Sequence, residues 1–112
     1  MGDRVSIAFK DGAEESVVLF NHWGGREFMK EARQYIRDLR QEIAADKKKG
    51  GHMESGPLGR LEPNTVMVDF VRHITKDKNR VESSLYFGAT ENDGDNSDNG
   101  HFKINVHTGD DE

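Results

Sequence analysis

A loop rich in aspartate and asparagine, residues 89–100, contains the side chains best suited to bind a cation. Asp93, Asp95 and Asp98 alternate with other polar residues, and Ca²⁺ and Mg²⁺ prefer such hard oxygen ligands. The same composition is typical of a solvated loop, in which Asp and Asn form turns with their own backbone. We favour the solvated loop, because short motifs match many unrelated sequences, and keep a divalent-cation site as the alternative.

The register of this loop excludes a true EF-hand. Counting from Asp95 places Asn99 at the fifth position and Gly100 at the sixth, where a ligand and the turn glycine belong. The twelfth position requires a bidentate Glu, but this chain has Val106 there, and no helix is predicted to enter the loop. A cation bound here would therefore need another geometry.

A second group of candidates, Asn21, His22 and Trp23, follows a predicted strand and precedes Gly24-Gly25, where a helix is predicted to begin. Side chains at such junctions lie at a sheet edge, where pockets often form. His22 could carry a proton or bind a ligand, and Trp23 could stack on one. In the alternative interpretation, which we favour, Trp23 covers the core and His22 bonds a loop.

The remaining histidines and serines indicate no reaction. His101 and His107 lie on one predicted strand about 20 Å apart, too far to share a metal ion. His101 could meet His22 and the acidic loop only if two strand ends are adjacent. The chain has no Cys and no Gly-x-Ser-x-Gly pattern, so no nucleophile is recognisable. The sequence therefore favours a protein that is not an enzyme.

Hydrophobic periodicity predicts the first half of the fold. Residues 4–10 alternate between polar and apolar, and the apolar run 16–20 follows the turn dipeptide Asp11-Gly12, which predicts a β-hairpin. An uninterrupted apolar stripe at helical spacing then predicts a helix over residues 26–45.

The second half of the chain is harder to assign. Over residues 64–75 the helical pattern competes with a β-branched composition that favours a strand, and we choose the helix. Strands are predicted at 81–87 and 101–107, as a second hairpin-like pair on either side of the acidic loop. The predicted class is α+β in the order β-β-α-α-β-β, an antiparallel sheet with both helices on one face.

The 112 residues are predicted to form a single domain, 1–112. Two parts are expected to be mobile. Residues 46–62 carry Lys and Gly without periodicity and read as a mobile insert, and residues 109–112 read as a frayed acidic tail.

The segment from Leu19 to Gly25, which includes His22-Trp23-Gly24-Gly25, resembles the strand–His-Trp-x-Gly–helix segment of certain small uncharacterised proteins, often phage- or prophage-encoded. Those proteins also tend to have a second helix, a short strand, a polar loop and a closing strand. The resemblance implies a helix at residues 64–75 and a single domain. It implies no activity, because none is established for those proteins.

Charge is distributed unevenly along the chain. The net charge is −5, and residues 80–112 alone carry 2 basic and 8 acidic side chains, a balance of −6. A nucleic-acid groove is not expected there, because phosphates require positive charge. No apolar run is long enough for a membrane span, so we expect a soluble, cytoplasmic protein without a membrane partner.

These observations predict a non-enzymatic accessory protein, related to phage proteins, that binds another protein. The alternative is a divalent-cation-binding protein or small metal-dependent hydrolase that uses Asp93, Asp95 and Asp98, with His22 and His101 nearby. Self-association through an exposed strand edge, giving a homo-oligomer, is a third possibility. The deciding question is whether residues 21–25 and 93–101 share one cleft.

Overall fold

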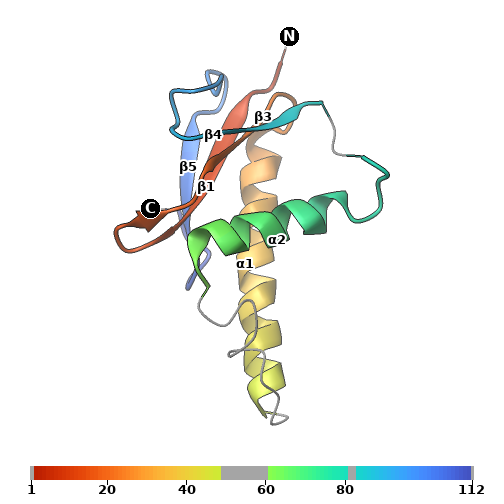
Figure 1. Cartoon of the computed structure of the whole chain (residues 1–112), viewed down its shortest axis with the longest axis vertical. Coiled ribbons are helices and arrows are strands. Elements are labelled where there is room, and N and C mark those ends of the chain that lie inside the picture. The colour runs from red at the N-terminus through yellow and green to blue at the C-terminus, as the bar shows by residue number, and fades with distance from the viewer. Residues whose placement is uncertain (1, 49–60, 81–82, 112) are drawn as a thin grey trace.

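The computed structural model describes residues 2–48, 61–80 and 83–111 (Figure 1). Its elements in chain order are β1 (Val5–Asp11), β2 (Glu14–Glu15), β3 (Val18–Asn21), α1 (Gly25–Lys48), α2 (Pro63–Thr75), β4 (Leu85–Gly88) and β5 (His101–Asn105). The α+β class and the order of strands and helices are confirmed, with β2 added inside the first hairpin. Most of the predicted mobile insert, residues 49–60, lies outside the described residues.

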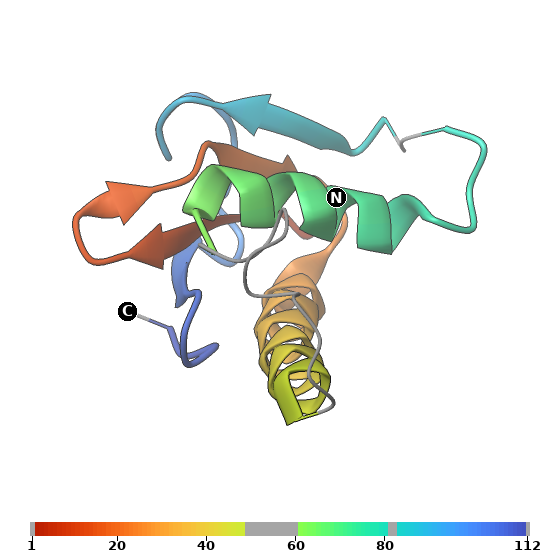
Figure 2. The same ribbon diagram turned by 60° about the horizontal axis from the view of Figure 1, so that its bottom comes forward.

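The strand β1 is at the centre of the sheet. β2 and β3 pair antiparallel with one side of β1, β4 pairs antiparallel with β3, and β5 pairs with the other side of β1. The β1–β5 pairing is parallel, so the last two strands do not form the predicted second hairpin. The cause is their connection, which leads from the end of β4 back to Arg4, where the Asn99 N–H donates to the Arg4 carbonyl. β4 and β5 therefore form opposite edges (Figure 2).

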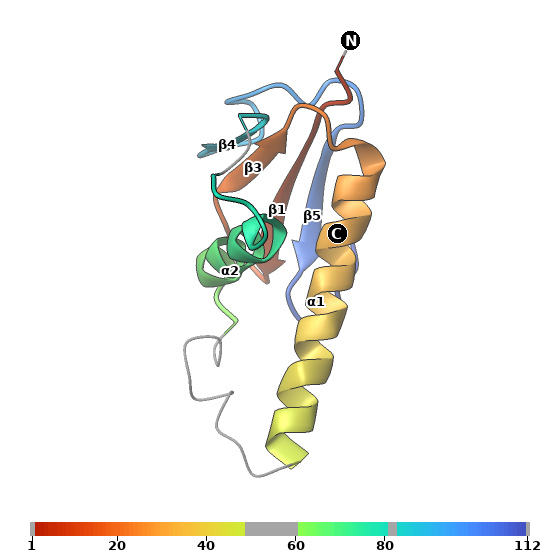
Figure 3. The ribbon, with the colours of Figure 1, turned by 90° about the vertical axis from the view of Figure 1, so that its right-hand side faces the viewer.

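Both helices pack on the face of β1 that carries Val5, Ile7 and Phe9, as the sequence predicts. Phe70 of α2 lies at the centre of this core, with its ring centroid 5.5 Å from that of Phe9 and 5.2 Å from that of Tyr35. Full burial of a side chain such as Phe70 contributes about 2–3 kcal/mol. The second half of α1 continues past the sheet (Figure 3).

The helix predicted over residues 64–75, where a strand was the competing interpretation, is confirmed as α2. Its adjacent residues Val66 and Met67 are both fully buried, whereas Val68 is 68% exposed. A strand would point Val66 and Met67 to opposite faces, so only a helix buries both against the same sheet. Neither α1 nor α2, the helices in the described ranges, is long and apolar enough to cross a membrane.

The opposite face of the sheet is covered by the acidic loop, residues 89–100. Phe20 is fully buried there, and the Tyr86 ring stacks on it with centroids 4.9 Å apart and planes 7° apart. Side chains at Gly88 or Gly94 would meet Phe20, so the loop passes directly over this ring. The acidic loop is therefore the cover of a second small core rather than a free turn.

The acidic tail is bound to the domain as far as Asp111, in contrast to the frayed tail that the sequence predicts. The Asn105 N–H donates to the Asp110 carbonyl at 2.9 Å, and Asp111 pairs with Ile104. Arg33 Nε donates to the Gly109 carbonyl at 3.1 Å. These bonds hold the tail against β5 and α1, and Asp110 also lies within ion-pair distance of Arg33 and Arg37, a contact between segments distant in sequence.

Candidate functional site

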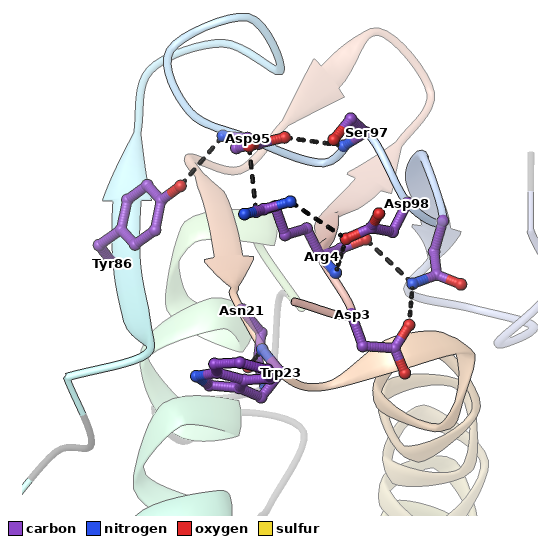
Figure 4. Close-up of polar contacts among 9 residues, drawn as sticks. Asp3, Arg4, Asn21, Trp23, Tyr86, Asp95, Ser97 and Asp98 are labelled. Carbon is purple, nitrogen blue, oxygen red and sulfur yellow. Dashed lines mark hydrogen bonds and ion pairs between the residues drawn. The ribbon is translucent and has the colours of Figure 1, made fainter. Parts of the chain in front are cut away.

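The two candidate segments meet at one end of the sheet, where Asp3 and Arg4 lie between them (Figure 4). On one side, the Asp3 N–H donates to the His22 carbonyl and the Gly25 N–H donates to the Asp3 carbonyl, both at 2.9 Å. On the other side, Asn99 Nδ2 donates to the Asp3 carboxylate at 2.6 Å. Gly25 has φ of 60°, and any side chain there would clash with the Asp3 carboxylate. The N-terminal segment thus joins the helix junction to the acidic loop.

Arg4 lies against two of the three predicted metal ligands. Its Nε lies 3.1 Å from Asp95 Oδ2, and its Nη1 lies 3.5 Å from Asp98 Oδ2. The Arg4 backbone N–H also donates to Asp98 at 2.9 Å. The guanidinium therefore occupies the place between these carboxylates that a bound cation would take.

Asp93, the third predicted ligand, faces elsewhere and accepts a hydrogen bond from the Thr90 N–H at 2.8 Å, which lowers the pKa of Asp93. Hydrogen bonds donated by Ser97 lower the pKa of Asp95, and the charge of Arg4 adds to this effect. In the described ranges, no three acidic or histidine side chains are grouped closely enough to bind a metal. Each of the three aspartates instead accepts hydrogen bonds from its own backbone donor, and Arg4 adds ion pairs to two of them, which orders the loop.

His101 lies on the covered face of the sheet and bonds the acidic loop to it. Its Nδ1 is 2.7 Å from Ser6 Oγ, which also accepts a hydrogen bond from Asn96 Nδ2 at 2.9 Å. Its Nε2 is 3.6 Å from Glu91, and burial lowers the pKa of His101. Ser6, His101 and Glu91 therefore lie in the order of a catalytic triad, but Ser6 is fully buried and cannot reach a substrate.

His22 and Trp23 line an open hollow of about 500 Å³ together with Ser83, Ser84 and Tyr86, here called the aromatic hollow. The Trp23 N–H donates to Asn21 Oδ1 at 3.0 Å, and the His22 N–H donates to the Ser84 carbonyl at 3.0 Å. The His22 and Trp23 rings meet edge to face, with centroids 4.6 Å apart. Trp23 is 60% exposed, so it lines a surface and does not cover the core as the favoured interpretation predicts.

Two aromatic side chains are exposed on β4: Tyr86 lines the aromatic hollow, and Phe87, the next residue, points to the other face of the sheet. Phe87 is 55% exposed and Tyr86 is 40% exposed. The Tyr86 hydroxyl accepts a hydrogen bond from the Asp95 N–H at 3.0 Å, so the acidic loop fixes this ring in place. The sequence shows these residues as apolar members of a predicted strand, which suggests a core role, and only the strand order places them at an edge.

A separate polar cluster joins the two helices and has no signature in the sequence. The Tyr35 hydroxyl on α1 donates to Asp69 on α2, and Arg72 Nε lies 2.9 Å from the other Asp69 oxygen. Burial raises the pKa of Tyr35, and the hydrogen bond to Asp69 raises it further. Burial opposes ionisation of Asp69, but hydrogen bonds from Arg72 and Tyr35 outweigh it and lower the pKa of Asp69. The cluster therefore links the helices through a protonated phenol and an ionised carboxylate.

Comparison with known proteins adds neither a family nor a neighbour. No family model matches the chain, and it has no significant match among curated proteins or solved structures.

Proposed function

We propose that this protein is a non-enzymatic accessory protein that binds another protein through the aromatic hollow and the edge strand β4. The observation that carries the proposal is the exposure of three aromatic side chains, Trp23, Tyr86 and Phe87, on one edge of the sheet. Aromatic residues are enriched in protein interfaces, where their burial supplies much of the binding energy.

One ring of the proposed surface is held in place before a partner binds. Tyr86 stacks on the buried Phe20 and accepts a hydrogen bond from the Asp95 N–H, and the Trp23 backbone is bonded to Asn21. A partner would therefore lose little free energy in ordering Tyr86, since the position of this ring is already set by the fold. Rigid aromatic anchors of this kind favour a role in recognition.

The groups that could have supported catalysis have structural partners instead. Ser6 is buried beneath the acidic loop, and Asp95 and Asp98 face Arg4. With these contacts, the polar residues of the acidic loop position Tyr86 and hold the loop over the sheet. They support a binding role over the metal-dependent hydrolase that the sequence left as an alternative.

The resemblance around His22-Trp23 extends the proposal to a phage or prophage setting. In that setting the protein would act in the cytoplasm on a host or phage protein. The negative charge of residues 80–112 would speed association with a basic partner, because opposite charges steer diffusional encounter.

The proposal is tested by a photo-crosslinking amino acid placed at position 23 and, as a matched control, at Gln41, an exposed residue of α1. Irradiation of cells that make each variant should give a discrete adduct from position 23 and none from position 41. The proposal is contradicted if position 23 gives no adduct, or if both positions give the same ones.

A further inference from the structure

The backbone of β4 has one side free to pair. The Ser84 carbonyl accepts from the His22 N–H, so Ser84 faces β3. Because inward and outward groups alternate along an antiparallel ladder, the N–H and C=O groups of Leu85 and Phe87 face away from β3. In the chain as described, no strand pairs with this outer side. It is a template for one additional strand.

The surroundings of this edge are negatively charged. Residues 83–98 contain the four acids Glu91, Asp93, Asp95 and Asp98 and no Lys or Arg. Arg4 offsets part of this charge. A side chain at Gly88 would meet Asp93, so Asp93 lies at the end of β4, and the Asp95 N–H bonds the Tyr86 hydroxyl. The negative charge is therefore adjacent to the aromatic hollow.

We propose that β4 binds an extended segment of another protein as an added strand, and that an Arg or Lys side chain of this segment enters the aromatic hollow. The hydrogen bonds to Leu85 and Phe87 hold the segment, as in strand addition generally. The side chains of the added segment alternate between the two faces of the sheet, so at least one of them points to the sheet face on which Tyr86 lies. There the cation lies against the Trp23 and Tyr86 rings, which attract positive charge, with Asp95 nearby.

A second copy of this chain suits the edge less well. Its own β4 and acidic loop bring the same four acids, so pairing of two β4 strands would place like charges together, with Arg4 and Lys78 only partly offsetting them. The aromatic hollow would also receive no cation. The charge distribution thus selects a basic segment of a different protein as the occupant.

The test uses the full chain and a set of ten-residue peptides of alternating Val and Thr that differ only in one central residue, Arg, Gln or Glu. Trp23 is the only Trp in the chain, so its fluorescence reports occupancy of the aromatic hollow. The Arg peptide should bind about tenfold more tightly than the Glu peptide, and added salt should reduce the difference. Binding should also slow hydrogen exchange at the amides of Leu85 and Phe87.

Two variants of Phe87 separate the backbone from the side chain. Phe87→Pro removes the outward N–H and leaves the ladder to β3 intact, because Pro is tolerated on edge strands. It should weaken binding of the Arg peptide about tenfold more than Phe87→Thr does, because both variants remove the aromatic ring and only Phe87→Thr keeps the N–H. Trp23→Ala should abolish the preference for Arg over Gln. If Phe87→Pro fails to fold, amide exchange in the unmodified chain decides the question.

Several results would overturn the inference. These are binding weaker than about 1 mM for every peptide, equal binding of the Arg and Glu peptides, or unslowed amides of Leu85 and Phe87 when peptide is bound. If exchange at these amides is already slow without peptide, and becomes slower as the protein concentration rises, a second copy occupies the edge instead. The inference rests on the proposed function but fails separately from it. If position 23 gives an adduct and any of these results is also obtained, the protein-binding role stands and strand addition at β4 is wrong.

Discussion

The two edges of the sheet are finished in different ways. At β5 the chain covers the C-terminal end of its own edge, because the Asn105 N–H donates to the Asp110 carbonyl and Arg33 binds the carbonyl of Gly109. At β4 no described segment pairs with the edge, and Tyr86 and Phe87 are exposed. Uncovered strand edges invite association, and proteins usually protect them with charge, Pro or a covering segment. The difference supports our proposal that a partner binds at β4.

The acidic residues near the two edges contact different arginines. Those of the tail attract Arg33 and Arg37 of α1 and so close one edge. Those of the acidic loop attract Arg4 and so fix the ring of Tyr86 beside the other edge. In each case a carboxylate helps to position backbone or an aromatic ring.

The largest effect is expected when the closed edge is opened. A chain that ends at Thr108 loses the bonds of the tail to Asn105 and Arg33, which should reduce the free energy of unfolding by about 2–3 kcal/mol. It should also associate at high concentration, since β5 becomes a free edge. Urea denaturation and analytical ultracentrifugation measure both effects.

The matched control for the tail is Asp110→Asn, which keeps the backbone bonds and removes only exposed ion pairs with Arg33 and Arg37. This control should cost about 0.5 kcal/mol or less. A truncated chain that is monomeric and as stable as the full chain would contradict this view of β5.

A smaller effect is expected when the loop beside the open edge is loosened. Arg4→Ala removes the guanidinium between Asp95 and Asp98, which should lower the melting temperature by about 2–4 °C because two exposed carboxylates then lie near each other without a cation. The Tyr86 ring should become mobile, which its NMR line shapes would report. Arg40→Ala on α1 is the control, and equal losses from both variants would count against a specific role for Arg4.

Strong acid should loosen the same loop. The folded-state pKa values of Asp93 and Asp95 are lowered, so their stabilisation is present above about pH 4 and is lost as pH falls through the lower folded values. Melting temperatures measured from pH 6 to pH 2 should fall over this window, and Asp95→Asn should make the fall shallower. An unchanged acid profile in Asp95→Asn would show that Ser97 and Arg4 do not stabilise its ionised form.

The smallest effect is expected from divalent cations. With Arg4 between Asp95 and Asp98, millimolar Ca²⁺, Mg²⁺ or Mn²⁺ should change the melting temperature by less than about 1 °C. The cation-binding alternative from the sequence requires a rise of several degrees, because an ion that binds only the folded state stabilises it. Differential scanning fluorimetry with and without EDTA distinguishes the two.

The parts of the fold that follow from local periodicity could be predicted from the sequence. The stripe from Phe28 to Ile43 defines α1, and the alternation of Val5, Ile7 and Phe9 identifies the buried face of β1. The helical spacing in Pro63–Thr75 also proved the better guide over β-branched composition. Each of these signals lies within one element and depends on burial of one face.

The features that depend on strand order could not be predicted. Nothing near Arg4 in the sequence indicates its pairing with Asp95 and Asp98, which lie more than 90 residues away. The parallel pairing of β5 likewise depends on the path of the acidic loop across the sheet. Tyr86 belongs to a strand that the sequence predicts. It lies at an edge of the sheet because β4 pairs only with β3 among the described strands. Candidate residues could be named from the sequence, but not the surface they form.

Backbone amide exchange in the dilute, isolated chain tests the central claim most directly, because it compares the two edges in one experiment. The amide of Asn105 should exchange slowly, since it donates to the Asp110 carbonyl, whereas those of Leu85 and Phe87 should exchange rapidly until the Arg peptide is added. Slow exchange at Leu85 and Phe87 in the isolated monomer, or rapid exchange at Asn105, would contradict the account.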